Sequence, residues 1–153
     1  VQMVDALFSY SQKVLDKHQV DILVIDAQHE CLNGETSAVF TAEGMQGCIC
    51  MYRMQSEEVR PIHVLLHELG HLLHIKVTGT LTEIPKSFVG HLLSLGIECS
   101  KLTAAQLQEL FADTFMLAVI NKHPELGVPE PNFSAKTLAH CYKYICTLFD
   151  SMR

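Results

Sequence analysis

The stretch that decides the fold is residues 61–76, which read PIHVLLHELGHLLHIK. Pro61 suits a first helical turn, and the apolar residues after it predict a buried helix over residues 61–76. On that helix His67 and His71 lie one turn apart on the same face, where their imidazoles can bind one metal ion. Glu68 projects about 100° away, near enough to reach a water on the metal but badly placed to ligate it. This spacing predicts metal-assisted hydrolysis, in which the metal acidifies the water and Glu68 accepts the proton.

The residues around this motif decide between two interpretations. In the alternative, the histidines are incidental and lie on a solvated helix face. The flanking residues are apolar, however, and they describe a buried helix. Buried His and Glu side chains are costly unless they are paired or bound to a metal. The context therefore favours a metal site.

A zinc ion in an open catalytic site needs a third protein ligand, and Glu109 is the candidate. Glu109 and Asp113 are four residues apart on a predicted helix, in line with Met116 and Ile120, so we expect this stripe to face inward. Glu109 can then bind the metal, and Asp113 can accept the free N–H of a ligating histidine. In the alternative, both carboxylates reach a polar edge of the helix and are solvated.

Three further histidines lie near the predicted site in sequence. His63 and His74 share the ligand face of the helix, and we expect them to support the site or to pack in the core. His91 lies between the two ligand helices in sequence and is a candidate donor to the oxyanion of a tetrahedral intermediate. The alternative for His91 is an ordinary structural histidine.

The rest of the chain predicts one α+β domain over residues 1–153, mostly helical, with a small three-stranded sheet that we expect to be antiparallel. Thr103 and Gln106 have the spacing of a capping box and open the helix that carries Glu109. Gly79 and Gly96 follow predicted helices at the position of a C-terminal cap. The predicted strands are residues 22–25, suited to a buried strand, 37–41 and 47–52, and the predicted helices are residues 2–18, 61–76, 87–95, 103–121 and 134 onward.

Composition excludes several classes of protein. The chain has 153 residues, 48% of them hydrophobic, and a formal net charge of −6 without a dense Lys/Arg cluster. Nucleic acid is therefore not the expected partner, and no apolar run approaches the length that crosses a bilayer. No secretory signal is recognisable, so we expect a cytoplasmic protein. The six cysteines form no Cys-x-x-Cys, and we expect free thiols rather than the alternative of three disulfides.

Two segments resemble a known family. Residues 60–73, RPIHVLLHELGHLL, resemble the active-site helix of the ImmA/IrrE family, including the basic residue that precedes the motif. Residues 109–115, ELFADTF, resemble its second signature, and Glu109 and Asp113 also follow the Glu-x-x-x-Asp pattern of gluzincins. The resemblance covers about residues 1–120. It implies a compact peptidase with one Zn²⁺ bound by His67, His71 and Glu109, and a repressor-type regulator as substrate.

The sequence thus predicts a zinc metallopeptidase that acts on a protein or peptide. One alternative is a regulatory or interaction module that binds zinc but cleaves little by itself. A purely structural zinc site is a weaker alternative, because such sites are closed by four protein ligands and have no use for Glu68.

Overall fold

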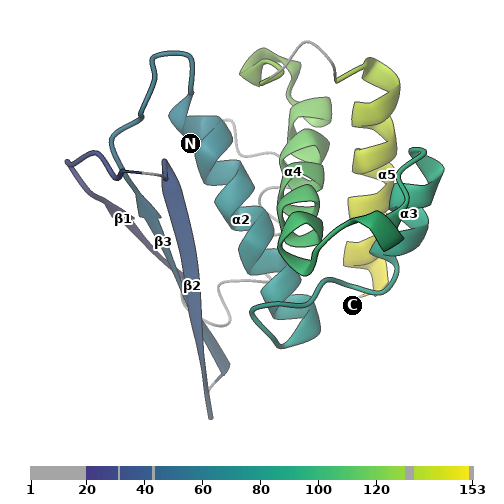
Figure 1. The fold of residues 1–153 in the computed structure, drawn as a ribbon, viewed down its shortest axis with the longest axis horizontal. Helices are drawn as coiled ribbons and strands as arrows, with labels where there is room; N and C mark the ends of the chain where they lie inside the picture. The colour runs from purple at the N-terminus through teal and green to yellow at the C-terminus, as the bar shows by residue number, and fades with distance from the viewer. Residues whose placement is uncertain (1–19, 31, 43, 130–132, 152–153) are drawn as a thin grey trace.

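The computed structural model describes residues 20–30, 32–42, 44–129 and 133–151. The predicted helix over residues 2–18 lies outside them. The remaining predicted elements are all present, and the predicted α+β class with a three-stranded sheet is confirmed (Figure 1). The strands are β1 (Val20–Val24), β2 (Gly34–Thr41) and β3 (Gly44–Met51); the helices are α2 (Pro61–Thr78), α3 (Phe88–Ser94), α4 (Ala104–Lys122) and α5 (Ala135–Ser151), with short 3₁₀ helices η1 (Cys99–Lys101) and η2 (Pro124–Leu126).

The sheet is mixed, so the expectation of an antiparallel sheet is wrong for one strand. Its order is β1-β3-β2, with β2 antiparallel to β3 and β1 parallel to β3. The last residue of β1 and the first residue of β2 both pair with Met51 at the end of β3, and β3 lies between the two earlier strands. β1 lies at an edge of this sheet, and the expectation of a buried strand is wrong for Leu23 and Val24, whose side chains are exposed. Among the described strands, β2 forms the other edge of the sheet.

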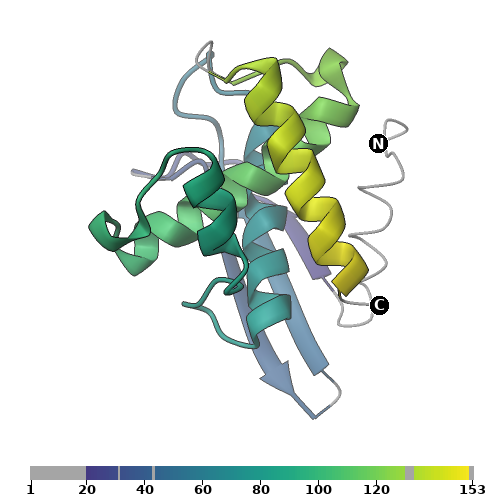
Figure 2. The ribbon, with the colours of Figure 1, turned by 90° about the vertical axis from the view of Figure 1, so that its right-hand side faces the viewer.

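The elements lie in successive layers, with α2 in the middle (Figures 1 and 2). One side of α2 packs on β2 and β3, and the other side packs on α4, which in turn packs on α5. The buried side chains form one continuous core across these layers, because α2 is apolar on both sides. The largest fully buried side chains include Ile49, Leu66, Leu72, Leu73, Phe88, Phe111, Phe115 and Ile145.

Local signals fix the ends of the two helices that matter most. Pro61 opens α2, and Gly79 ends it in the left-handed conformation, with φ of 75°. At the start of α4 the predicted capping box is formed: the Gln106 amide N–H donates to Thr103 Oγ1 at 3.1 Å, and the Thr103 amide N–H donates to Gln106 Oε1 at 2.9 Å. These signals set which residues of α2 and α4 face each other.

The two helices approach each other closely at Gly70. A methyl group at this position would lie 2.7 Å from Ala112 Cα and 2.8 Å from the Ala112 carbonyl oxygen. Only glycine therefore permits the observed distance between α2 and α4. Because Glu109 lies about one helical turn before Ala112, this contact also sets how near Glu109 comes to α2.

Two further expectations concern the chain as a whole. None of the described helices combines the length and apolar character that a bilayer-spanning helix requires. The five cysteines within the described ranges, Cys48, Cys50, Cys99, Cys141 and Cys146, are free thiols, as predicted.

Candidate metal centre and pocket

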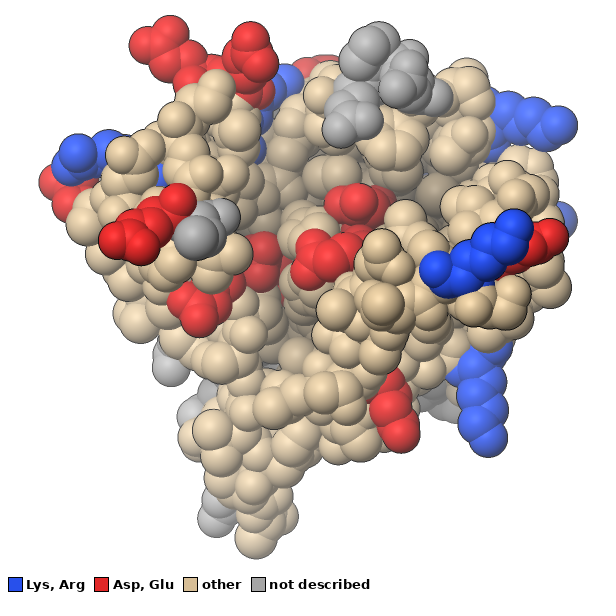
Figure 3. Space-filling model, viewed as in Figure 1, with Lys and Arg blue, Asp and Glu red and all other residues tan. Residues whose placement is uncertain are grey.

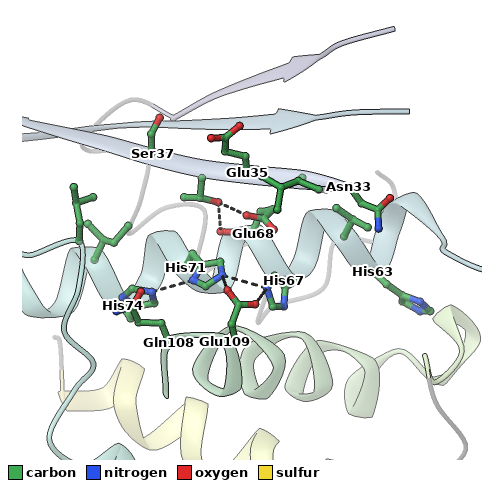
Figure 4. A pocket seen from close by; sticks show the side chains of 16 residues that line it. Asn33, Glu35, Ser37, His63, His67, Glu68, His71, His74, Gln108 and Glu109 are labelled. Carbon is green, nitrogen blue, oxygen red and sulfur yellow. Dashed lines mark hydrogen bonds and ion pairs between the residues drawn. The ribbon is translucent and has the colours of Figure 1, made fainter. Parts of the chain in front are cut away.

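A pocket of about 600 Å³ lies between the edge strand β2 and the facing surfaces of α2 and α4 (Figure 4). One wall is the segment over residues 32–37, which includes the start of β2. The opposite wall is formed by the motif of α2 and by Gln108 and Glu109 of α4. The motif residues of α2 and Glu109 of α4, which the sequence predicted to act together, therefore lie in one cavity.

His67, His71 and Glu109 meet in this pocket and could hold a metal ion. Nε2 of His67 lies 2.8 Å from Glu109 Oε2, and Nε2 of His71 lies 3.1 Å from Glu109 Oε1. The two Nε2 atoms are 3.2 Å apart. Figure 4 shows the two imidazoles and the carboxylate pointing toward one another from α2 and α4.

These separations suit a small tetrahedral ion. Ligand atoms about 2.0–2.2 Å from a tetrahedral zinc lie about 3.3–3.6 Å from one another. The observed separations of 2.8, 3.1 and 3.2 Å are slightly smaller. Side-chain movements of a few tenths of an ångström would therefore admit the ion.

Glu109 differs from the expectation in one respect, because its side chain does not face inward. It is 60% exposed, whereas the His67 and His71 side chains are 19% and 13% exposed. The first turns of α4 border the open pocket, and the buried part of this helix begins only at Phe111. Glu109 thus reaches the two histidines from the solvent side.

Asp113 supports His67 from the second helix. Its Oδ1 lies 2.8 Å from His67 Nδ1, the nitrogen that does not face the metal position. A hydrogen on Nδ1 leaves the lone pair of Nε2 free, which is the tautomer a metal ligand needs. The structure therefore brings Asp113 to the place where the sequence predicted it.

The charges of this cluster are strongly coupled. Burial opposes the protonated form of His67, but hydrogen bonds and charge attraction from Asp113 and Glu109 outweigh it and raise the pKa of this imidazole to about 10. Conversely, hydrogen bonds from His67 and His71 hold the pKa of Glu109 well below its usual range. Without a metal the site is therefore an ion pair, and a metal must displace the proton on His67.

This coupling predicts that the stability of the metal-free protein falls as pH rises from 6.5 to about 10. The His67 imidazole of the unfolded chain loses its proton near 6.5, whereas the folded protein keeps it until about 10. In this window the folded state binds more protons than the unfolded chain, so the free energy of unfolding falls, by at most about 1.4 kcal/mol per pH unit. Urea unfolding of the wild type and of His67→Asn in chelator at several pH values measures the difference. Equal slopes for the two proteins would contradict it.

His74 contacts the other ligating histidine. Its Nε2 lies 3.0 Å from His71 Nδ1, and its side chain is 1% exposed. Burial lowers the pKa of His74 to about 4, and the neighbouring His71 adds to this, whereas the main chain of Glu83 acts in the opposite direction. The interaction with Glu83 falls short of a hydrogen bond to Nδ1. At neutral pH His74 is therefore uncharged.

The carboxylate of Glu68 accepts a hydrogen bond from a strand of the sheet. Thr36 of β2 donates from Oγ1 to Glu68 Oε1 at 2.7 Å and lies 3.2 Å from the Glu68 carbonyl oxygen. Gly34 makes room for this arrangement, since a methyl group there would lie 2.7 Å from Val64 Cγ1 and 3.1 Å from Glu68 Cγ. Glu68 is 7% exposed and lines the pocket. Figure 4 shows its carboxylate turned toward β2.

Replacing Thr36 with Val should destabilise the protein by about 1–3 kcal/mol, because a buried carboxylate oxygen loses its donor. Valine has nearly the same shape and favours strands, so other effects are small. Urea unfolding measures the change. Thr147→Val is the matched control, since this exposed threonine bonds, among the described residues, only to the Lys143 carbonyl of its own helix, and we expect a change within about 0.5 kcal/mol. Equal effects of the two substitutions would contradict the contact.

His91 lies away from the pocket, whereas His63 lines it without belonging to the ligand group. His91 is not among the pocket-lining residues; it stacks on Tyr144, with ring centroids 4.7 Å apart, and its Nε2 lies 3.8 Å from Cys141 Sγ. Burial lowers the pKa of His91 to about 4. The structure therefore does not bring the predicted oxyanion donor to the site. His63 directs Nε2 at the carbonyl oxygens of Leu126 and Gly127, 3.0 and 2.9 Å away, and anchors that loop to α2.

The pocket is acidic. Its lining includes Glu35, Glu68 and Glu109 and, among the described residues, no Lys or Arg. The space-filling view shows acidic side chains gathered around the hollow at the centre of this face, with basic ones toward the periphery (Figure 3). This distribution suits a cation in the pocket and disfavours phosphate groups.

Sequence reasoning missed Thr36, Gly34 and Gly70. Gly70 carried a usable signal, because a glycine inside an apolar helix is unfavourable and indicates close packing. Thr36 and Gly34 carried none, since their roles depend on which strand lies beside α2. A scan against models of protein families, a search of curated proteins and a search of solved structures found no match to this chain.

Proposed function

We propose that this protein is a zinc-dependent peptidase, with His67, His71 and Glu109 as metal ligands and Glu68 as general base. The observation that carries the proposal is the meeting of these three ligand groups beside Glu68 in one open pocket. We also propose membership of the ImmA/IrrE family and a cytoplasmic location, on the sequence features given above.

The donor set favours zinc over the hard cations. Two imidazoles and one carboxylate suit Zn²⁺, whereas Mg²⁺ and Ca²⁺ prefer oxygen ligands only. Three protein ligands correspond to a catalytic site with an open position, because structural zinc sites have four. When bound, zinc would polarise the substrate carbonyl and acidify a water molecule.

The chain itself supplies the proton acceptor. Thr36 occupies Oε1 of Glu68 with its hydroxyl, so we assign Oε2 as the atom that takes the proton from the attacking water. The same carboxylic acid can then return the proton to the leaving amine. Asp113 holds the Nδ1 hydrogen of His67 and thereby keeps its Nε2 directed at the metal.

The wall formed by β2 supports a peptide as substrate. Within the part of the chain that the structure describes, this strand pairs only with β3, and its first residues line the pocket. The free backbone groups of an edge strand can pair with an extended peptide. An extended segment beside β2 would thus pass the metal position. A repressor-type regulator is the substrate that the family resemblance suggests.

The test has two parts, metal content and hydrolysis. We expect the protein to bind one zinc ion per chain, and Glu109→Ala, which removes one ligand, to lose it in elemental analysis. We expect the zinc-loaded protein to cleave members of a panel of unfolded proteins, with cleavage stopped by a chelator and restored by zinc. Zinc binding without any cleavage would instead indicate the regulatory module, and unchanged metal content of Glu109→Ala would place the third ligand elsewhere.

A further inference from the structure

His74 is a polar side chain in a place that packing alone does not explain. It lines the pocket, is 1% exposed and makes a T-shaped contact with Phe111, with ring centroids 5.7 Å apart. A buried imidazole is costly compared with an apolar side chain of similar size. The neighbouring positions Leu72, Leu73 and Ile75 are apolar and equally buried. The polarity of His74 therefore needs a partner.

That partner is His71. The ring of His74 presents Nε2 to His71 Nδ1 at 3.0 Å, and the two rings are nearly perpendicular, at 79°. This separation is typical of an N–H···N hydrogen bond. The dashed lines of Figure 4 show His74, His71 and His67 as a connected row along α2.

Metal binding fixes the direction of this hydrogen bond. A ligating His71 must offer the lone pair of Nε2, so its hydrogen lies on Nδ1. The hydrogen bond then runs from His71 Nδ1 to His74 Nε2, and His74 carries its own hydrogen on Nδ1. No other arrangement of the two neutral rings leaves both the ligand lone pair and the hydrogen bond in place.

We infer that His74 is a positioning residue of the metal centre: its Nε2 accepts the Nδ1 hydrogen of His71 and thereby aims the His71 lone pair at the metal. The inference rests on the metal site proposed above. His74 does for His71 what Asp113 does for His67, but without charge. The carboxylates of Glu109 and Asp113 already balance a divalent cation, and a third carboxylate in place of His74 would reduce the positive charge that activates the substrate.

Two substitutions separate this role from packing. His74→Leu fills a similar volume and removes the acceptor, whereas His74→Gln keeps an acceptor oxygen at about the reach of Nε2. We expect His74→Leu to weaken zinc binding by about 10- to 100-fold and His74→Gln to restore most of the affinity. Competition with a chelator of known affinity measures both. His91→Leu is the matched control, since it removes a second buried histidine, one that does not line the pocket, and its zinc affinity should equal that of the wild type.

Each result bears on a different proposal. Wild-type protein that binds no zinc would overturn the metal site and this inference with it. Tight binding by the wild type together with equal affinity of His74→Leu would overturn the inference alone, as would a loss in His74→Gln as large as in His74→Leu.

The wild type gives a second test that needs no variant. Long-range ¹⁵N–¹H NMR correlations of the zinc-loaded protein report which ring nitrogen of each histidine carries hydrogen. We expect His74 with hydrogen on Nδ1 and a bare Nε2. A hydrogen on Nε2 of His74 would overturn the inference even if the variants fail to fold.

Discussion

Glu68→Gln should abolish hydrolysis while zinc stays bound. The amide keeps the size of the side chain and can still pair with the Thr36 hydroxyl, but it cannot accept a proton from the attacking water. Loss of a general base costs about 10²- to 10⁴-fold in rate. Glu68 does not belong to the ligand group, so metal content should remain at one ion per chain. The measurement is the initial rate of peptide cleavage beside elemental analysis of the same sample.

The control for this substitution removes a carboxylate elsewhere. Glu57 lies in the loop before α2, is exposed and does not line the pocket. Glu57→Gln changes the net charge by the same amount and should leave the rate unchanged. Cleavage by Glu68→Gln at the wild-type rate would remove Glu68 from the mechanism and leave the metal site standing.

Gly70→Ala should be the most disruptive small substitution in the motif helix. Its methyl group would lie 2.7 Å from Ala112 Cα, a backbone atom that cannot move without moving α4. We expect a loss of about 1–3 kcal/mol in the free energy of unfolding. Because the displaced helix carries Glu109, zinc affinity should fall as well. Urea unfolding and chelator competition measure the two effects.

Gly90→Ala provides a control with the opposite sign. Gly90 lies within α3, and a methyl group there would meet no atom within 4 Å. Replacing a helical glycine with alanine should then stabilise the protein by up to about 1 kcal/mol. If Gly70→Ala had the same free energy of unfolding and the same zinc affinity as the wild type, the packing of α2 on α4 would not require glycine at this position.

Local patterns were sufficient to predict the described helices and the ligand group. The apolar spacing of residues 61–76 predicted α2, and the Thr103 and Gln106 pair predicted the first turn of α4. Given those two helices, spacing alone put His67 and His71 on one face and Glu109 one turn from Asp113. The structure brings these four side chains together as the sequence indicated.

Features that depend on distant segments could not be predicted in the same way. The parallel pairing of β1 with β3 depends on the path of a loop, about which strand propensity carries no information. The link from Thr36 to Glu68 depends in turn on β2 being the strand beside α2. His91 lies between the ligand helices in sequence but does not line the pocket, which agrees with the alternative of an ordinary structural histidine.

The ligand group joins α2 and α4, the two helices that pack closely at Gly70, and this arrangement has a consequence for folding. The proposed ligands come from two helices, and residues 72–108 lie between His71 and Glu109 along the chain. An ion bound to all three would cross-link the two ends of this long loop in the folded protein. Its binding free energy would then offset part of the entropic cost of closing the loop during folding. Occupancy by zinc would then raise the melting temperature in proportion to the logarithm of its free concentration. Metal supply would govern how long the protein survives in the cell as well as whether it can act.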